Sequence, residues 1–138
     1  MANLNLRIIT PRKVVLEEEV ISISVPTMDG EITILPHHIN LFTKLTEGIV
    51  KIKTEKKEDY LAVGGGYLQT NGITVNLLVS RAYHQTEIDE KLTNLAIEDA
   101  KKILKESKDE SQRAEAMVAI RRSVVDMKLI RRRKRSTI

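Results

Sequence analysis

The placement of proline and glycine divides this 138-residue chain into two parts with different periodicity. All three prolines and all six glycines lie before residue 73. This part consists of short segments in which apolar and polar residues alternate, at residues 4–10, 20–25, 31–35, 48–54 and 59–80. Asn71-Gly72 is a strong hairpin signal, because both residues tolerate a positive φ. Many short strands with turns between them predict an antiparallel β-sandwich or barrel.

After Arg81 the apolar residues recur with a helical period instead. The first expected helix carries one apolar stripe, formed by Ile88, Leu92, Leu95, Ala96, Ile103 and Leu104. Thr86 and Asp89 have the spacing of a capping box at its start. A polar stretch at 105–111 separates this helix from a second one at about 111–132. A helix pair with such modest stripes gains most of its stability by packing on something else.

These patterns predict a β + α chain, with an N-terminal antiparallel β-sandwich in residues 1–86 and a C-terminal two-helix hairpin in residues 87–138. The formal net charge of +4 is unevenly distributed. Residues 1–86 hold nine side chains of each sign, whereas residues 128–138 hold six basic side chains and no acidic one. The basic end suits an acidic protein, a lipid headgroup or a nucleic acid. The chain has no tryptophan and few other aromatic residues, which disfavours base stacking.

No group of residues has the pattern of a catalytic or metal site. His37 and His38 are adjacent, so on an extended chain they point to opposite sides, and the only other histidine is His84. The segment 64–67 lacks the Gly-Lys-Ser/Thr ending of a phosphate-binding loop, and we interpret it as a glycine bend. Glu17–Glu19 are interpreted as solvated turn residues. We therefore expect no enzymatic activity, no metal and no cofactor.

Several motifs, and the order of the segments, resemble the ε subunit of the F-type ATP synthase. The stretch RIITPRKVVLEEEVISISVPTMDGEITILPHHINLF (7–42) has a Thr-Pro start, a Val-Pro pair, an acidic-Gly-acidic turn and the motif Ile-Leu-Pro-x-His. TEGIVKI (46–52) and YLAVGGGYLQTNGITVNLLVSRA (60–82), with Gly-Gly-Tyr-Leu, resemble the strands that follow in that family. The resemblance covers essentially the whole chain, because a helical hairpin follows the strands in both.

The resemblance implies a non-catalytic central-stalk subunit of a proton- or sodium-translocating ATP synthase. In that family the sandwich holds the γ subunit of the rotor shaft and rests on the membrane ring of c subunits. The helical hairpin extends toward the catalytic α and β subunits and inhibits ATP hydrolysis; a helix of about 20 residues spans about 30 Å, enough for that reach. The implied location is the cytoplasmic side of a bacterial inner membrane, reached peripherally through the complex. No apolar run in the sequence is long enough to span a bilayer.

The resemblance also implies contact residues. Glu31 and His38 match family positions that face the c-ring. In the family, basic residues of the second helix meet an acidic segment of the catalytic β subunits. The corresponding candidates in this sequence are Arg113, Arg121, Arg122 and Lys128.

Some members of the family bind ATP through an Ile-Asp-x-x-Arg-Ala sequence at the start of the first helix. Ile88 and Asp89 match this sequence, but Leu92 and Thr93 stand at the Arg and Ala positions. Because the missing Arg is the natural partner of a phosphate, we expect weak or absent ATP binding. Two other functions remain open from the residues alone. One is a small nucleic-acid-binding module with a basic C-terminal tail, and the other is a metal-dependent sandwich enzyme.

Overall fold

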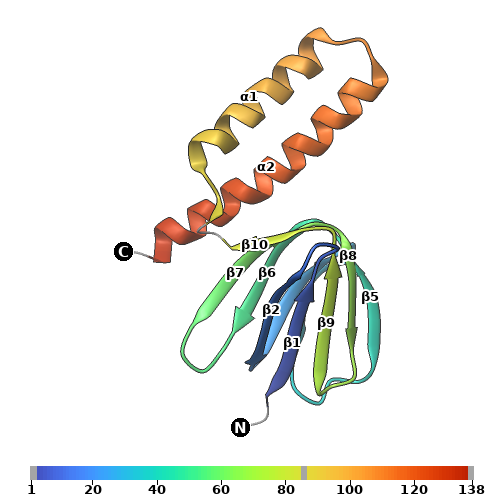
Figure 1. Cartoon of the computed structure of the whole chain (residues 1–138), viewed down its shortest axis with the longest axis vertical. Coiled ribbons are helices and arrows are strands. Elements are labelled where there is room, and N and C mark those ends of the chain that lie inside the picture. The colour runs from blue at the N-terminus through green and yellow to red at the C-terminus, as the bar shows by residue number, and fades with distance from the viewer. Residues whose placement is uncertain (1–2, 85–86, 137–138) are drawn as a thin grey trace. The chain divides into compact units, whose positions relative to one another are not determined.

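The computed structural model describes residues 3–84 and 87–136, with side chains described up to residue 131 of the last helix. The chain divides into two compact units after His84. In the described residues, the first unit contains ten strands and the second contains two helices (Figure 1). The predicted fold class, a β-sandwich followed by a two-helix hairpin, is confirmed.

Two five-stranded sheets form the sandwich. The first sheet has the order β2-β1-β9-β8-β5, with β1 at Leu4–Ile9, β2 at Val14–Val20, β5 at Leu41–Leu45, β8 at Gly66–Thr70 and β9 at Thr74–Val79. The second sheet has the order β10-β7-β6-β3-β4, with β3 at Ser22–Thr27, β4 at Gly30–Ile34, β6 at Gly48–Lys53, β7 at Glu58–Val63 and β10 at Ala82–His84. Neighbouring strands are antiparallel, as predicted, except β1 and β9, which run parallel.

Alternation along the strands places one set of side chains between the sheets. In β1, for example, Leu4, Leu6 and Ile8 are fully buried. The hydrophobic core is a cluster of aliphatic side chains, formed by Leu4, Leu6, Ile8, Val20, Ile23, Val25, Ile34, Leu45, Val50, Ile52, Leu61, Val63, Leu68, Val75, Leu77 and Val79. Burial of this apolar surface is the main favourable contribution to folding of the unit.

The interpretation of Glu17–Glu19 as turn residues is wrong, because they lie inside strand β2. This strand is an edge of the first sheet, where charged side chains stay in contact with water and also discourage pairing with another chain. Strand β10, which has only three residues, was not visible as a separate alternating segment.

The interpretation of segment 64–67 as a glycine bend is confirmed. Gly64 and Gly65 connect β7 in the second sheet to β8 in the first sheet. A Cβ on Gly66 would lie 2.0 Å from the Leu78 carbonyl oxygen and 2.7 Å from Val79 Cα. Glycine at this position therefore permits close backbone approach between β8 and β9.

The second unit consists of helices α1 (Glu90–Glu106) and α2 (Glu110–Ser136), which run antiparallel (Figure 1). Asp89 itself is the N-cap of α1, and Thr86 of the predicted capping box lies outside the described residues. Ala100 and Ala116 are equally far from the middle of the turn, and both are 3% exposed. Small side chains thus occupy buried positions in both helices. The expected apolar stripe of α1 instead stays exposed at Leu92, Leu95 and Ile103.

Candidate interaction surfaces

A row of apolar side chains crosses the outward face of the first sheet. Ile9 on β1 lies between its pairing partners Val14 on β2 and Leu78 on β9. Leu78 in turn pairs with Tyr67 on β8, and the Phe42 ring of β5 stacks on the Tyr67 ring with 5.4 Å between centroids. Leu78 and Tyr67 are about half exposed, at 47% and 48%, and Phe42 is 66% exposed. We call these five residues the apolar row; contiguous exposed apolar surface of this kind marks a contact with another molecule.

The sequence analysis missed the apolar row, although the sequence contains a signal for it. Ile8-Ile9 and Leu77-Leu78 are adjacent apolar pairs within alternating strands. One member of each pair has to face away from the core, because successive side chains point to opposite faces. The pairing register then places Ile9 directly beside Leu78. That neighbourhood depends on the parallel pairing of β1 with β9, which the sequence did not reveal.

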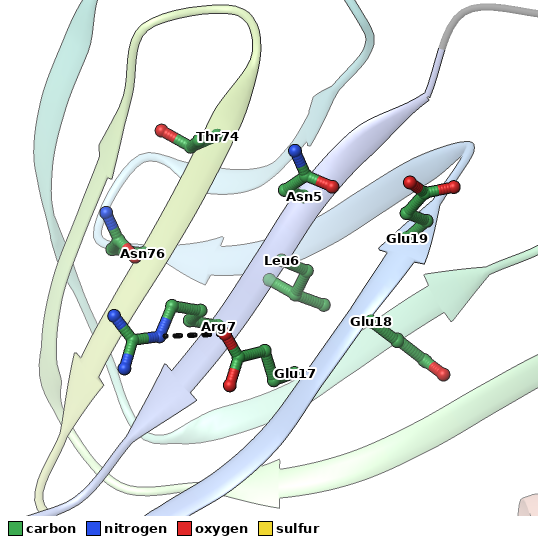
Figure 2. A pocket seen from close by; sticks show the side chains of 8 residues that line it. All are labelled: Asn5, Leu6, Arg7, Glu17, Glu18, Glu19, Thr74 and Asn76. Atoms are coloured by element: carbon green, nitrogen blue, oxygen red, sulfur yellow. Dashed lines mark ion pairs between the residues drawn. The ribbon is translucent and has the colours of Figure 1, made fainter.

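Next to the apolar row, the same face of the sheet becomes polar, and Figure 2 shows this part as an open hollow. Arg7 on β1 forms an ion pair with Glu17 on β2, with Nε and Oε1 3.6 Å apart. Glu19 accepts a long hydrogen bond from the Asn3 amide at 3.4 Å. The hollow is lined by Asn5, Leu6, Arg7, Glu17, Glu18, Glu19, Thr74 and Asn76. The charges of both signs and the amide groups suit a protein surface better than a phosphate backbone.

Glu31 and His38 belong to the edge strand β4 and to the loop that follows it. Glu31 is the second residue of β4, and His38 lies four residues beyond its last residue, Ile34. Glu31 is exposed, whereas His38 is half-buried. Strand rise places Glu31 about 10 Å from Ile34, so Glu31 lies near the start of β4 and His38 lies beyond its end, and the two candidate c-ring contacts do not share one loop.

The loop that carries His38 is fixed to the turn between β8 and β9. The His37 amide donates to the Gly72 carbonyl oxygen at 2.8 Å, and His37 has a φ of 67°. Gly72 has a φ of 87°, and a Cβ there would lie 2.5 Å from the His38 carbonyl oxygen. The His38 ring Nδ1 lies 2.7 Å from the Ile39 carbonyl oxygen. Among the described residues no group of three or more His, Cys, Asp or Glu side chains is arranged to hold a metal ion.

Asp89, the second residue of the incomplete ATP motif, has a structural role at the start of α1. Its Oδ1 accepts hydrogen bonds from the amides of Lys91 at 2.9 Å and Leu92 at 3.1 Å. The Thr93 hydroxyl donates to the Asp89 carbonyl oxygen at 2.8 Å. Ile88, the first residue of the motif, is buried. The Asp89 carboxylate thus satisfies two free backbone amides at the start of the helix, as an N-cap does in general.

The candidate cations of α2 have different surroundings. Arg113 donates from Nη1 to the Leu104 carbonyl oxygen, which ties it to the end of α1. Arg121, Arg122 and Lys128 are exposed, and in the described part of the chain none of the three forms an ion pair. At 3.6 residues per turn, Arg121 and Lys128 lie within about 20° of each other around the helix, whereas Arg122 is about 100° from Arg121.

No helix within the described ranges combines the length and apolar character needed to cross a membrane. A family model described as "ATP synthase, Delta/Epsilon chain, beta-sandwich domain" matches residues 3–85. The chain belongs to this ATP synthase family. The matched range contains the whole sandwich described above, including both its apolar row and the edge strand β4.

Curated relatives from bacteria and plastids extend the match to the helical hairpin. The ATP synthase epsilon chain of Moorella thermoacetica is 38% identical over 129 residues, which cover 93% of this chain and 96% of that protein. The chloroplastic epsilon chain of Pinus koraiensis is 31% identical over 120 residues, covering 87% and 88%. A chain in the cryo-EM structure of the Euglena gracilis mitochondrial ATP synthase, OSCP/F1/c-ring, superposes with a TM-score of 0.78 at 27% identity, covering 87% of this chain and 76% of that one. The present chain is therefore a non-catalytic ATP synthase epsilon subunit.

Proposed function

We propose that this epsilon subunit couples the γ subunit to the c-ring in the central stalk of a proton- or sodium-translocating ATP synthase, and that its helical hairpin inhibits ATP hydrolysis. The apolar row is the observation that carries the proposal. Among the described residues it joins side chains from all five strands of the first sheet on a surface that faces away from the core. Such a surface fits a long-lived contact with another subunit, because permanent interfaces are more apolar than the rest of a protein surface.

The γ subunit is the proposed occupant of the apolar row. Epsilon relatives form part of a rotary complex, and the similar Euglena chain comes from an assembly that contains F1 and the c-ring. The polar hollow beside the apolar row gives the interface a rim with charges of both signs. Such a rim fixes orientation, while apolar anchors such as Tyr67 and Phe42 supply most of the affinity. The same mixed charges disfavour nucleic acid, which requires a predominantly basic surface.

Edge strand β4 and the loop after it are the proposed contact with the c-ring. Glu31 is exposed there and His38 is half-buried, and the hydrogen bond from the His37 amide to the Gly72 carbonyl oxygen restrains the loop. A rigid loop loses little conformational entropy on binding, so it can maintain contact with a ring of repeated loops. Through this contact the subunit is held at the membrane surface, on the cytoplasmic side in a bacterium.

The exposed face of α2 is the proposed inhibitory surface. Arg121 and Lys128 lie on one side of the helix, and the exposed side chains of Met117 and Val124 lie near the same side. A helix face with cations and apolar residues fits an acidic groove of the catalytic α and β subunits. Arg113 has a structural role in the hairpin as described, so we expect it to contact a catalytic subunit only after α1 and α2 separate.

The proposal is tested by capture of purified γ subunit on the immobilised chain. Leu78→Glu places a charge in the middle of the apolar row, and we expect it to abolish capture, because a buried unpaired charge costs several kcal/mol, roughly 3 or more. Leu35→Glu is the matched control, because Leu35 is similarly exposed, at 54%, but lies in the loop after β4. Full capture of γ by the Leu78→Glu variant, with its fold verified by circular dichroism, would contradict the assignment.

The inhibitory part of the proposal has a separate test. Deletion from Lys105 onward removes α2 and leaves the sandwich intact. In a reconstituted complex this deletion is expected to raise ATP hydrolysis without loss of assembly. Unchanged hydrolysis would show that the hairpin of this chain does not inhibit, while the assignment of the apolar row would remain.

A further inference from the structure

We propose that Glu47, Arg81 and Tyr83 form a latch that fixes strand β10 to the sandwich and so limits the reach of the helical hairpin. Glu47 lies in the connection between β5 and β6, and Arg81 lies in the connection between β9 and β10. Both connections cross from the first sheet to the second. The latch therefore joins two corners of the sandwich at the point where the chain leaves it.

Arg81 contacts both other members of the latch. Its Nη2 donates to Glu47 Oε1 and its Nη1 donates to the Tyr83 hydroxyl, while its Cζ lies 5.4 Å from the centroid of the Tyr83 ring. The side chains of Arg81 and Glu47 are only 17% and 26% exposed. A charge-assisted pair partly removed from water is stronger than an exposed pair, and loss of one partner leaves the other charge poorly solvated.

Strand β10 depends on this support because its own ladder is short. Among the described residues, only Ala82–His84 pair with β7, and they do so at the edge of the second sheet. Such a short edge strand contributes few hydrogen bonds and little buried surface. One backbone contact assists the latch, since the Gly64 amide donates to the Arg81 carbonyl oxygen at 2.9 Å. The side chains of the latch thus add to the ladder with β7 and to the packing of Ala82 against the core.

Release of β10 from β7 lengthens the tether, which is the segment that connects the sandwich to the helical hairpin. The second unit begins directly after His84, the last residue of β10. Three residues that leave the ladder and stay extended add about 10 Å of reach, at about 3.3 Å per residue. This regulatory consequence rests on the proposed inhibition by the hairpin, whereas the existence of the latch does not.

Hydrogen exchange on the full-length chain tests the latch directly. In the variant Glu47→Gln, the amides of Ala82–His84 are expected to exchange about tenfold faster, since a charge-assisted bond is lost. The double variant of Glu47→Gln and Arg81→Gln is expected to accelerate exchange no more than Arg81→Gln alone, because loss of Arg81 already removes the contact with Glu47 as well as the contact with Tyr83. Glu58→Gln is the matched control: it breaks the Lys51–Glu58 pair of the same sheet, whose side chains are 39% and 43% exposed. We expect no effect of this control on β10.

Two exchange results would overturn the latch. One is wild-type exchange of the β10 amides in Glu47→Gln, and the other is faster exchange throughout the sandwich, which would indicate a general loss of stability.

In the reconstituted complex, Glu47→Gln is expected to lower ATP hydrolysis below the wild-type rate, because a longer tether favours inhibition. Faster exchange of β10 with unchanged hydrolysis would refute the regulatory consequence. If the wild-type chain does not inhibit at all, the proposed function fails, and the latch is judged on exchange alone.

Discussion

The close approach of β8 and β9 makes Gly66→Ala the sharpest test of the packing. The new Cβ would lie 2.0 Å from the Leu78 carbonyl oxygen and 2.7 Å from Val79 Cα. Both neighbours are backbone atoms of β9, so no rotamer change relieves the overlap. The two strands have to separate, which weakens the ladder between Gly66 and Val79 and shifts two residues of the apolar row, Tyr67 and Leu78.

The expected cost follows from that geometry. Overpacking of a well-packed core typically costs about 1–3 kcal/mol, and an overlap with backbone atoms of two successive β9 residues belongs at the upper end, about 3 kcal/mol. For a domain of this size each kcal/mol lowers Tm by about 4–8 °C. Gly66→Ala is therefore expected to lower the Tm of the sandwich by at least about 12 °C. In contrast, Gly65→Ala meets only the Leu45 carbonyl oxygen at 3.5 Å, an ordinary contact.

Thermal unfolding followed by far-UV circular dichroism compares the two variants in the full chain. Gly65→Ala is the matched control, since it adds the same methyl group one residue away. We expect its effect to stay within about 1 kcal/mol, in part because alanine restricts the unfolded chain. If Gly66→Ala and Gly65→Ala melt at the same temperature, the argument from backbone overlap is refuted. A wild-type Tm of Gly66→Ala combined with loss of γ capture would refute it as well. The substitution would then have disturbed the contact with γ and not the packing of β8 on β9.

Further expectations concern the hairpin and one surface pair. Arg121→Ala combined with Arg122→Ala should weaken inhibition of ATP hydrolysis more at low than at high salt, because exposed charges are screened; equal effects at both ionic strengths would argue against an electrostatic contact. Asp89→Ala should cost about 1 kcal/mol of helical stability, measured by circular dichroism, because two amide hydrogen bonds of the cap are lost. Calorimetry with ATP should detect weak binding or none, and a micromolar Kd would contradict this. The Asp59 carboxylate raises the pKa of Lys57, first through a hydrogen bond and then through its charge. Asp59→Asn should therefore lower that pKa in an NMR titration. Because the folded-state pKa is the higher one, the pair stabilises the fold below the ordinary lysine pKa, and that contribution is lost as pH rises through the folded-state value.

Much of the fold was predictable because its signals are local. Alternation in β1, β3 and β6, the glycine-rich corner before β8 and the Asn71-Gly72 turn each depend on a few neighbouring residues. Strand β2 was not predicted because its three successive glutamates interrupt the alternation of apolar and polar residues. An edge strand tolerates such charges. The apolar stripe of α1 was detected, but it was wrongly expected to be the buried side, since small residues, Ala100 in α1 and Ala116 in α2, form buried positions of the hairpin.

The contact residues were only partly predictable. Glu31, His38, Arg121, Arg122 and Lys128 were candidates from the family resemblance, and their contacts with other subunits stay predictions. The structure gives Arg113 a role at the turn of the hairpin that spacing alone does not reveal, since its partner is a backbone carbonyl nine residues away. The latch likewise joins residues that are 34 positions apart in the chain.

The sequence by itself determined that a β-domain precedes a helical hairpin, that the basic excess lies at the C-terminal end, and that no thiol chemistry is available. These properties depend on composition and short-range periodicity. Only the tertiary structure decided that β1 pairs with β9 in parallel, which assembles the apolar row, and that Glu47 meets Arg81. Contacts between distant residues arise from the pairing of strands and from connections that pass between the two sheets. The apolar–polar alternation of one strand carries no information about which strand pairs with it.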